Sequence, residues 1–130
     1  MTTWLITGCS TGLGRALAQQ VLEAGHNAVI TARDAESLTE LAEQYPDTTL
    51  TLPLDVTNAE QIASAVEGAT EQFGGIDVLV NNAGYGYRAA VEEGEDHALQ
   101  QLFATNYFGA VHMIQEVLPQ IGRASCRERV

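Results

Sequence analysis

The 130-residue chain contains no lysine, and its six basic residues, all arginines, stand against 17 acidic residues. The formal net charge of −11 argues against non-specific binding to nucleic acid or to an anionic membrane surface. Two cysteines, Cys9 and Cys126, are too few for a disulfide framework or a cysteine metal cluster, which indicates a reducing compartment and, by default, the cytoplasm. The three histidines, His26, His97 and His112, do not have the spacing of metal ligands, so we predict no metal site.

Long apolar runs are also absent. The first apolar segment stops at Gly8, which is too early for a membrane span, and the N-terminus lacks the basic residues of a signal peptide. The length allows one ordinary domain, and a hydrophobic content of 45% is typical of a globular protein rather than a disordered one.

Short apolar segments alternate with segments of helical period. Strands are expected at residues 3–7, 27–31, 48–54 and 76–80, and helices after each of them, the last running through residues 99–118. Asp34 or Ser37 and then Asn58 are predicted helix caps, with Gly74 ending the third helix. Strands joined by helices pair in parallel through right-handed crossovers, so the pattern predicts a doubly wound α/β sheet. Pro53 suits an edge strand, whereas the apolar segment 76–80 predicts a strand buried on both faces.

The first strand leads into a glycine-rich segment, TGCSTGLG, at residues 7–14. Glycines at this place let backbone N–H groups approach a pyrophosphate at the N-terminus of the following helix. The alternative is an ordinary tight turn, but the position between the first strand and the first helix favours dinucleotide binding.

The end of the second strand bears on the choice of cofactor. An acidic residue here would bind the ribose hydroxyls of NAD, but the chain has Ala32 followed by Arg33. A guanidinium can pair with a 2′-phosphate, so we predict NADP in preference to NAD, with a solvated surface arginine as the alternative.

Two more motifs follow later strands, where the ligands of open α/β sheets bind: Asp55-Val56 and NNAG at residues 81–84. Together with TGCSTGLG and the asparagine of TNYFG (residues 105–109), they resemble in order and spacing the N-terminal part of the short-chain dehydrogenase/reductase family, over residues 3–120. The resemblance implies a Rossmann-like doubly wound parallel sheet that is incomplete, with its first four strands in the order 3-2-1-4. It also implies a small alcohol or carbonyl substrate and a homo-oligomeric full-length protein.

The resemblance also assigns roles to single residues. It implies phosphate contacts from Gly8, Ser10, Gly12, Leu13 and Gly14, adenine contacts from Asp55 and Val56, and contacts with the nicotinamide-side ribose from Asn82, Ala83 and Gly84. Thr7 would brace the last of these loops, and Asn106 would hold a water molecule in a catalytic proton relay.

For two further sets of residues, the sequence allows both a structural and a functional interpretation. Cys9 adjoins a helix N-terminus that can lower a thiol pKa, so it is either a small filler of the loop or a redox switch, and we favour the filler. Tyr85, Tyr87 and Arg88 follow NNAG and either contact substrate or face solvent.

The family's chemistry requires a serine and a Tyr-x-x-x-Lys motif, which a chain without lysine cannot contain. We therefore expect the cofactor half of an NADP-dependent oxidoreductase, inactive by itself. One alternative is a non-catalytic dinucleotide-binding sensor or scaffold of the same fold. Another is a different α/β enzyme, such as a methyltransferase, in which Asn82 to Gly84 and Asn106 would have no evident role.

The last ten residues, IGRASCRERV, differ from the preceding 120. They hold three of the six arginines and lack the apolar strand that the family pattern requires next. The segment resembles one translated frame of a sequencing-library adapter. We expect residues 1–120 to be the native dinucleotide-binding part and residues 121–130 a non-native tail, with a genuine basic tail or a frameshift as alternatives.

Overall fold

The computed structural model describes the backbone of residues 2–125 and the side chains up to residue 121. Four strands form one parallel sheet: β1 (Thr3–Ile6), β2 (Asn27–Ala32), β3 (Thr49–Pro53) and β4 (Val78–Val80). Their order is β3-β2-β1-β4, and in the register Leu5 of β1 lies opposite Val29 of β2 and Leu79 of β4. This topology confirms the predicted Rossmann-like fold, and Pro53 lies on an edge strand as predicted.

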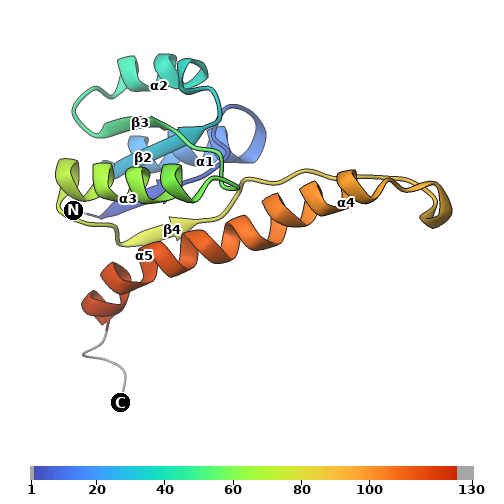
Figure 1. Cartoon of the computed structure of the whole chain (residues 1–130). Coiled ribbons are helices and arrows are strands. Elements are labelled where there is room, and N and C mark those ends of the chain that lie inside the picture. The colour runs from blue at the N-terminus through green and yellow to red at the C-terminus, as the bar shows by residue number, and fades with distance from the viewer. Residues whose placement is uncertain (1, 126–130) are drawn as a thin grey trace.

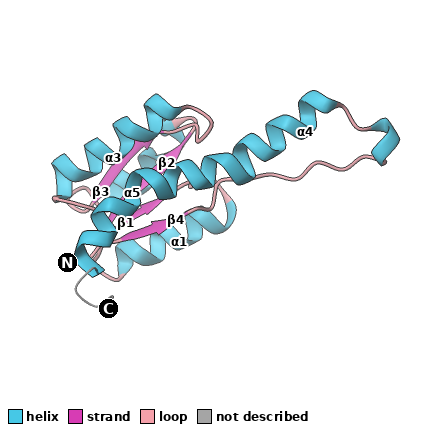
Figure 2. Cartoon of the chain, turned by 60° about the horizontal axis from the view of Figure 1, so that its bottom comes forward, coloured by secondary structure: helices cyan, strands magenta, loops and turns pink. Residues whose placement is uncertain are grey.

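Helices cover both faces of the sheet. Helix α1 (Gly12–Glu23), the 3₁₀ turn η1 (Ala35–Leu38) and α2 (Thr39–Gln44) follow β1 and β2, and α3 (Ala59–Phe73) follows β3. After β4 come the 3₁₀ turn η2 (Val91–Glu93), α4 (Asp96–Phe103), the π-helical turn η3 (Ala104–Gly109) and α5 (Ala110–Ser125). Figure 2 shows α1 on one side of the sheet and α3 with α5 on the other.

Two apolar clusters hold these layers together because alternate strand residues point to opposite faces. Leu5 and Val29 contact the side of α3 and α5, where Met113 and Val117 are also fully buried. Ile30 faces the other way, toward the helices α1 and α2. The core therefore fixes the carboxyl ends of the strands at one edge of the sheet.

The predicted helix ends agree with the structure at three places. The Asp34 carboxylate accepts a hydrogen bond from the Glu36 N–H (3.0 Å), and Asn58 Oδ1 accepts one from the Gln61 N–H (3.1 Å). Gly74 ends α3 in the left-handed conformation, with φ of 84°. These contacts are local, which is why the sequence predicts them.

The last helix extends beyond residue 118, where the sequence places the end of its helical pattern, and continues to Ser125. The segment contains no proline, and Ile121 packs against the core cluster on the α3 side of the sheet, so the helix gains contacts by continuing. The rest of the predicted non-native tail, with Cys126, Arg127 and Arg129, lies outside the described residues.

The predicted burial of residues 76–80 on both faces is wrong. Strand β4 contains only Val78–Val80, and its residues are half-buried because no strand lies beyond β4 in the described part of the chain. Figure 1 shows that α4 and the loop before it project beyond the sheet. Several apolar side chains of α4, η3 and α5 are exposed, among them Leu99, Phe103, Tyr107 and Leu118.

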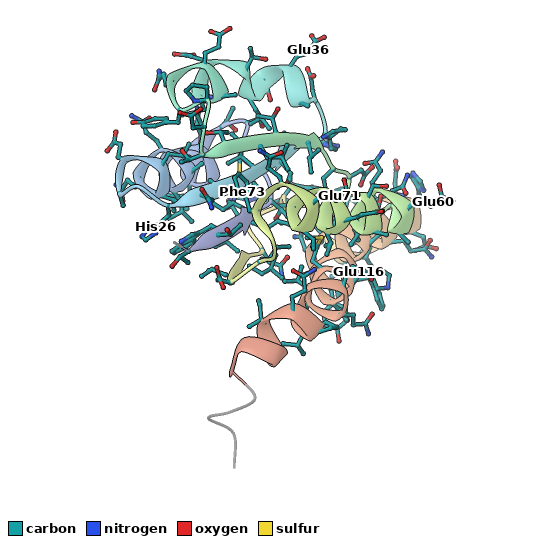
Figure 3. All side chains as sticks on the ribbon, turned by 90° about the vertical axis from the view of Figure 1, so that its left-hand side faces the viewer. His26, Glu36, Glu60, Glu71, Phe73 and Glu116 are labelled. Atoms are coloured by element: carbon teal, nitrogen blue, oxygen red, sulfur yellow. The ribbon has the colours of Figure 1, made fainter. Side chains whose placement is uncertain are left out.

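The acidic excess lies on the surface. Glu36, Glu60, Glu71 and Glu116 project from η1, α3 and α5 into solvent (Figure 3). Within residues 2–125, none of the helices combines the length and the apolarity needed to cross a membrane.

Candidate cofactor-binding site

A cavity of about 750 Å³ opens at the carboxyl ends of the strands. It brings together the glycine loop after β1, the end of β2, the segment after β3 and the NNAG loop after β4. Of the predicted binding residues, those that line it are Gly8, Ser10, Leu13, Arg33, Asp55, Val56, Asn82, Ala83 and Gly84. Thr7, Gly12, Gly14 and Asn106 do not line the cavity.

The glycine loop leaves its backbone open to a ligand. Gly8 adopts a φ of 69°, and its carbonyl oxygen accepts a hydrogen bond from Asn82 Nδ2 (3.0 Å). A Cβ on Gly14 would collide with that carbonyl oxygen and with the same amide, so only glycine lets α1 start this close to the NNAG loop. A glycine-rich loop at a helix N-terminus fits the pyrophosphate of a dinucleotide.

Thr7 holds the NNAG loop against the end of β1. Its buried Oγ1 accepts hydrogen bonds from the backbone N–H groups of Asn82 and Ala83, both at 3.0 Å, and donates one to the Val80 carbonyl oxygen at 3.4 Å. These hydrogen bonds tie the NNAG loop to β1, as expected for Thr7, and they turn the hydroxyl toward the loop backbone rather than into the cavity.

Cys9 is fully buried beneath the glycine loop. Its Sγ donates to the Ile6 carbonyl oxygen at 3.2 Å, and burial raises the pKa of the thiol to about 11. The nearby helix N-terminus therefore does not activate the thiol, and the geometry agrees with the filler interpretation rather than with a redox switch.

Asp55 is held in its ionised form. Its Oδ1 accepts two hydrogen bonds from Thr57, one from Oγ1 (2.6 Å) and one from the backbone N–H (2.9 Å). These bonds chiefly lower the pKa of the Asp55 carboxyl, with a smaller contribution from the charge of Arg33. Arg33 lines the cavity with an exposed side chain, while the neighbouring Asp34 is engaged as a helix cap.

Asn106 lies in the π-helical turn and ties this turn to the residue after NNAG. Its Oδ1 accepts from the Tyr85 N–H (3.0 Å), and its Nδ2 donates to the Tyr85 carbonyl oxygen (2.6 Å). The Asn106 side chain thus satisfies both the backbone N–H and the backbone carbonyl oxygen of Tyr85. The water-holding role of Asn106 stays a prediction.

Several cavity residues were not predicted from the sequence: Thr11, Ala32, Leu54, Thr57, Gln101 and Thr105. Tyr85 lines the cavity as well, and the sequence left its role open. Two features of the sequence could have identified Thr57, Gln101 and Thr105. A threonine two residues after an aspartate is typical of a side-chain-capped turn, and the four-residue spacing of Gln101 and Thr105 places both on one helix face.

Histidines, cysteines and carboxylates form no group of three or more that could hold a metal ion within the described residues. The polar side chains that line the cavity include the Arg33 guanidinium, the Asp55 carboxylate and the carboxamides of Asn82 and Gln101.

The chain matches known proteins over nearly its whole length. The family model described as short chain dehydrogenase matches residues 2–127. A protein named Oxidoreductase calM from Penicillium decumbens is 44% identical over 115 residues, which cover 85% of this chain and 38% of that protein.

Solved structures agree with the sequence match. A short-chain dehydrogenase from Streptomyces avermitilis superposes with a TM-score of 0.91 at 38% identity, over 95% of this chain and 46% of that one. A 3-ketoacyl-(acyl-carrier-protein) reductase from Brucella melitensis, described as complexed with NADH, gives 0.91 at 28% identity, covering 98% and 53%. The chain thus spans about half the length, or less, of these relatives. On its motifs, fold and family match together, the chain belongs to the short-chain dehydrogenase family.

Proposed function

We propose that the whole protein is an NADP-dependent oxidoreductase that transfers hydride between the nicotinamide and a small alcohol or carbonyl substrate. The observation that carries this proposal is the cavity at the carboxyl ends of the strands, where the glycine loop, Arg33, Asp55 and the NNAG loop meet. In open α/β sheets this edge is where dinucleotides bind.

The cavity residues fit an extended dinucleotide. Backbone N–H groups of the glycine loop at the start of α1 would bind the pyrophosphate, and Asn82 to Gly84 would contact the nicotinamide-side ribose. Asp55 and Val56 would border the adenine. When bound, the cofactor supplies or accepts the hydride. The chain's own residues position it, and Asn106 would hold a water molecule for proton transfer.

Arg33 favours NADP over NAD. One structural relative is described with NADH, so family membership by itself does not decide between the two cofactors. Here Asp34 caps η1 and does not line the cavity, whereas Arg33 lines it and is exposed. A guanidinium forms a charge-assisted, bidentate pair with a 2′-phosphate, which is stronger than the single hydrogen bond it could donate to a 2′-hydroxyl.

Arg33→Ala in the protein completed with its catalytic half tests this assignment. We expect NADP binding to weaken by about tenfold or more, because a charge-assisted pairing contributes ~1.5 kcal/mol even at an exposed site, and NAD binding to change little. Arg88→Ala is the matched control, since Arg88 does not line the cavity. Equal losses for the two cofactors in Arg33→Ala would refute the assignment.

The 130-residue chain itself should not turn over substrate. Without lysine it has no Tyr-x-x-x-Lys motif, and Asn106 alone supplies no proton donor. NADPH oxidation with a panel of ketones and aldehydes measures this, and turnover above a no-protein control in a preparation free of host reductases would contradict it.

The absence of a Tyr-x-x-x-Lys motif from these 130 residues also fits a second candidate, a non-catalytic dinucleotide-binding sensor or scaffold. A serine and a Tyr-x-x-x-Lys motif encoded beyond residue 120 of the native gene would support the enzyme, and a native gene without them would support the sensor. Resequencing that gene also tests the assignment of residues 121–130 as a non-native tail. For either candidate, we propose a cytoplasmic homo-oligomer that binds neither nucleic acid nor membrane, in keeping with the net charge of −11.

A further inference from the structure

One helix wall of the cavity carries polar groups that the proposed function does not use. Gln101 of α4 and Thr105 of η3 lie four residues apart and both line the cavity. The end of η3 is fixed beside the residues after β3, because a Cβ on Gly109 would lie 2.7 Å from Val56 Cγ2. The end of this helical segment at Gly109 therefore lies beside Val56, which is proposed to border the adenine, and Gln101 lies eight residues earlier in the lining of the same cavity.

The Gln101 carboxamide is available for a ligand. Among the hydrogen bonds of residues 2–125, none involves this side chain, which is exposed. Asp55 lines the same cavity, and Thr57 occupies its Oδ1 with two hydrogen bonds, which leaves Oδ2 as the acceptor oxygen of that carboxylate. The cavity lining thus includes a carboxamide and a carboxylate oxygen that no hydrogen bond among the described residues occupies.

We infer that Gln101 is a specificity-determining residue that recognises the adenine base through its N6/N7 edge. The inference rests on the proposed function, because that function places the adenosine beside Asp55 and Val56. A glutamine amide matches this edge: its oxygen accepts from the N6 amino group while its nitrogen donates to N7. The second N6 hydrogen is then left for Asp55 Oδ2, so both hydrogens of the amino group find an acceptor.

Hypoxanthine distinguishes this arrangement from simple shape complementarity. It has the size of adenine but carries an oxygen in place of the N6 amino group. That oxygen cannot donate to the Gln101 carbonyl, and it faces the Asp55 carboxylate with a lone pair. Loss of a donor that a site is built to accept is a large part of specificity between analogues of equal shape.

The test compares NADPH with its hypoxanthine analogue, reduced nicotinamide hypoxanthine dinucleotide phosphate, as ligands of the 130-residue chain. Titrations followed by NMR measure dissociation constants into the millimolar range, so weak binding still yields a ratio of affinities. The variants are Gln101→Leu, which keeps the volume and removes the amide, and Gln100→Leu as the matched control. Gln100 is the neighbouring glutamine on α4 and does not line the cavity.

We expect the wild-type chain to prefer NADPH, and Gln101→Leu to reduce this preference by about fivefold to 150-fold, the range of one bidentate base contact. Gln100→Leu should keep the wild-type ratio. If Gln101→Leu binds NADPH and keeps the full preference for adenine, the inference is wrong while the cofactor assignment stands. If the wild-type chain binds neither dinucleotide under these conditions, the proposed cofactor site fails and the inference fails with it.

Discussion

The brace formed by Thr7 allows a prediction with a magnitude that follows from the structure. Thr7→Val keeps the shape of the side chain and removes its hydroxyl. The Ala83 N–H then loses the acceptor that Thr7 Oγ1 provides, whereas the Asn82 N–H keeps a second acceptor in the Val80 carbonyl oxygen at 3.1 Å. One backbone donor in a part-buried place is left unsatisfied, which costs ~2 kcal/mol of the free energy of unfolding.

Thr31→Val serves as the control for burial and for the change of hydroxyl to methyl. Thr31 is also fully buried, and its Oγ1 donates a single hydrogen bond to the Ile6 carbonyl oxygen at 3.1 Å. That oxygen keeps the Cys9 Sγ as a donor at 3.2 Å, so no polar group is orphaned and we expect a loss below ~1 kcal/mol.

Urea unfolding at low protein concentration gives the two free energies, and amide hydrogen exchange locates the effect. The Ala83 amide should exchange faster in Thr7→Val than in the wild type, while amides in the centre of β2 change only with the global stability. If the two valine variants lose equal free energy, or if exchange at Ala83 is unaltered, the bracing role of Thr7 is wrong.

Three further predictions concern the same fold. Gly14→Ala should destabilise the chain by ~3 kcal/mol or prevent folding, because the added Cβ would collide with the Gly8 carbonyl oxygen. In Gly68→Ala, on α3, the added Cβ meets only the Leu52 side chain at 3.3 Å, so this variant should be neutral or stabilising. Thermal melting compares the stabilities of the two variants. Burial raises the pKa of Cys9 from 9.0 to about 11, so its contribution to stability is complete below pH 9 and is lost as pH rises to 11. The free energy of unfolding should therefore fall by up to ~1.4 kcal/mol per pH unit more steeply in the wild type than in Cys9→Ala, and identical slopes would refute the assigned pKa. Finally, one edge of β4 pairs with no strand among residues 2–125, and apolar side chains of α4 and α5 are exposed, so we predict self-association. Sedimentation should show oligomers that Leu118→Glu weakens, and a monomer at every concentration would contradict this.

Features set by neighbouring residues were predictable from the sequence alone. The caps at Asp34 and Asn58 and the turn at Gly74 depend on contacts within a few residues, and all three lie where the sequence places them. The alternation of apolar strands with amphipathic helices likewise determines parallel pairing, because a crossover helix returns the chain to the same edge of the sheet. The motifs at the strand ends were therefore bound to meet.

Other features depended on contacts between distant segments and needed the tertiary structure. The apolar composition of residues 76–80 predicts burial, yet β4 is half-buried because burial depends on what lies beyond the strand. The sequence left Cys9 as a filler of the loop or a redox switch and favoured the filler. The tertiary structure decides between them, because the loop folds the thiol into the core and burial raises its pKa. Gln101 lies on α4, which runs into the π-helical turn, and its spacing from Thr105 defines only a helix face. Tertiary packing decides that this face lines the cavity.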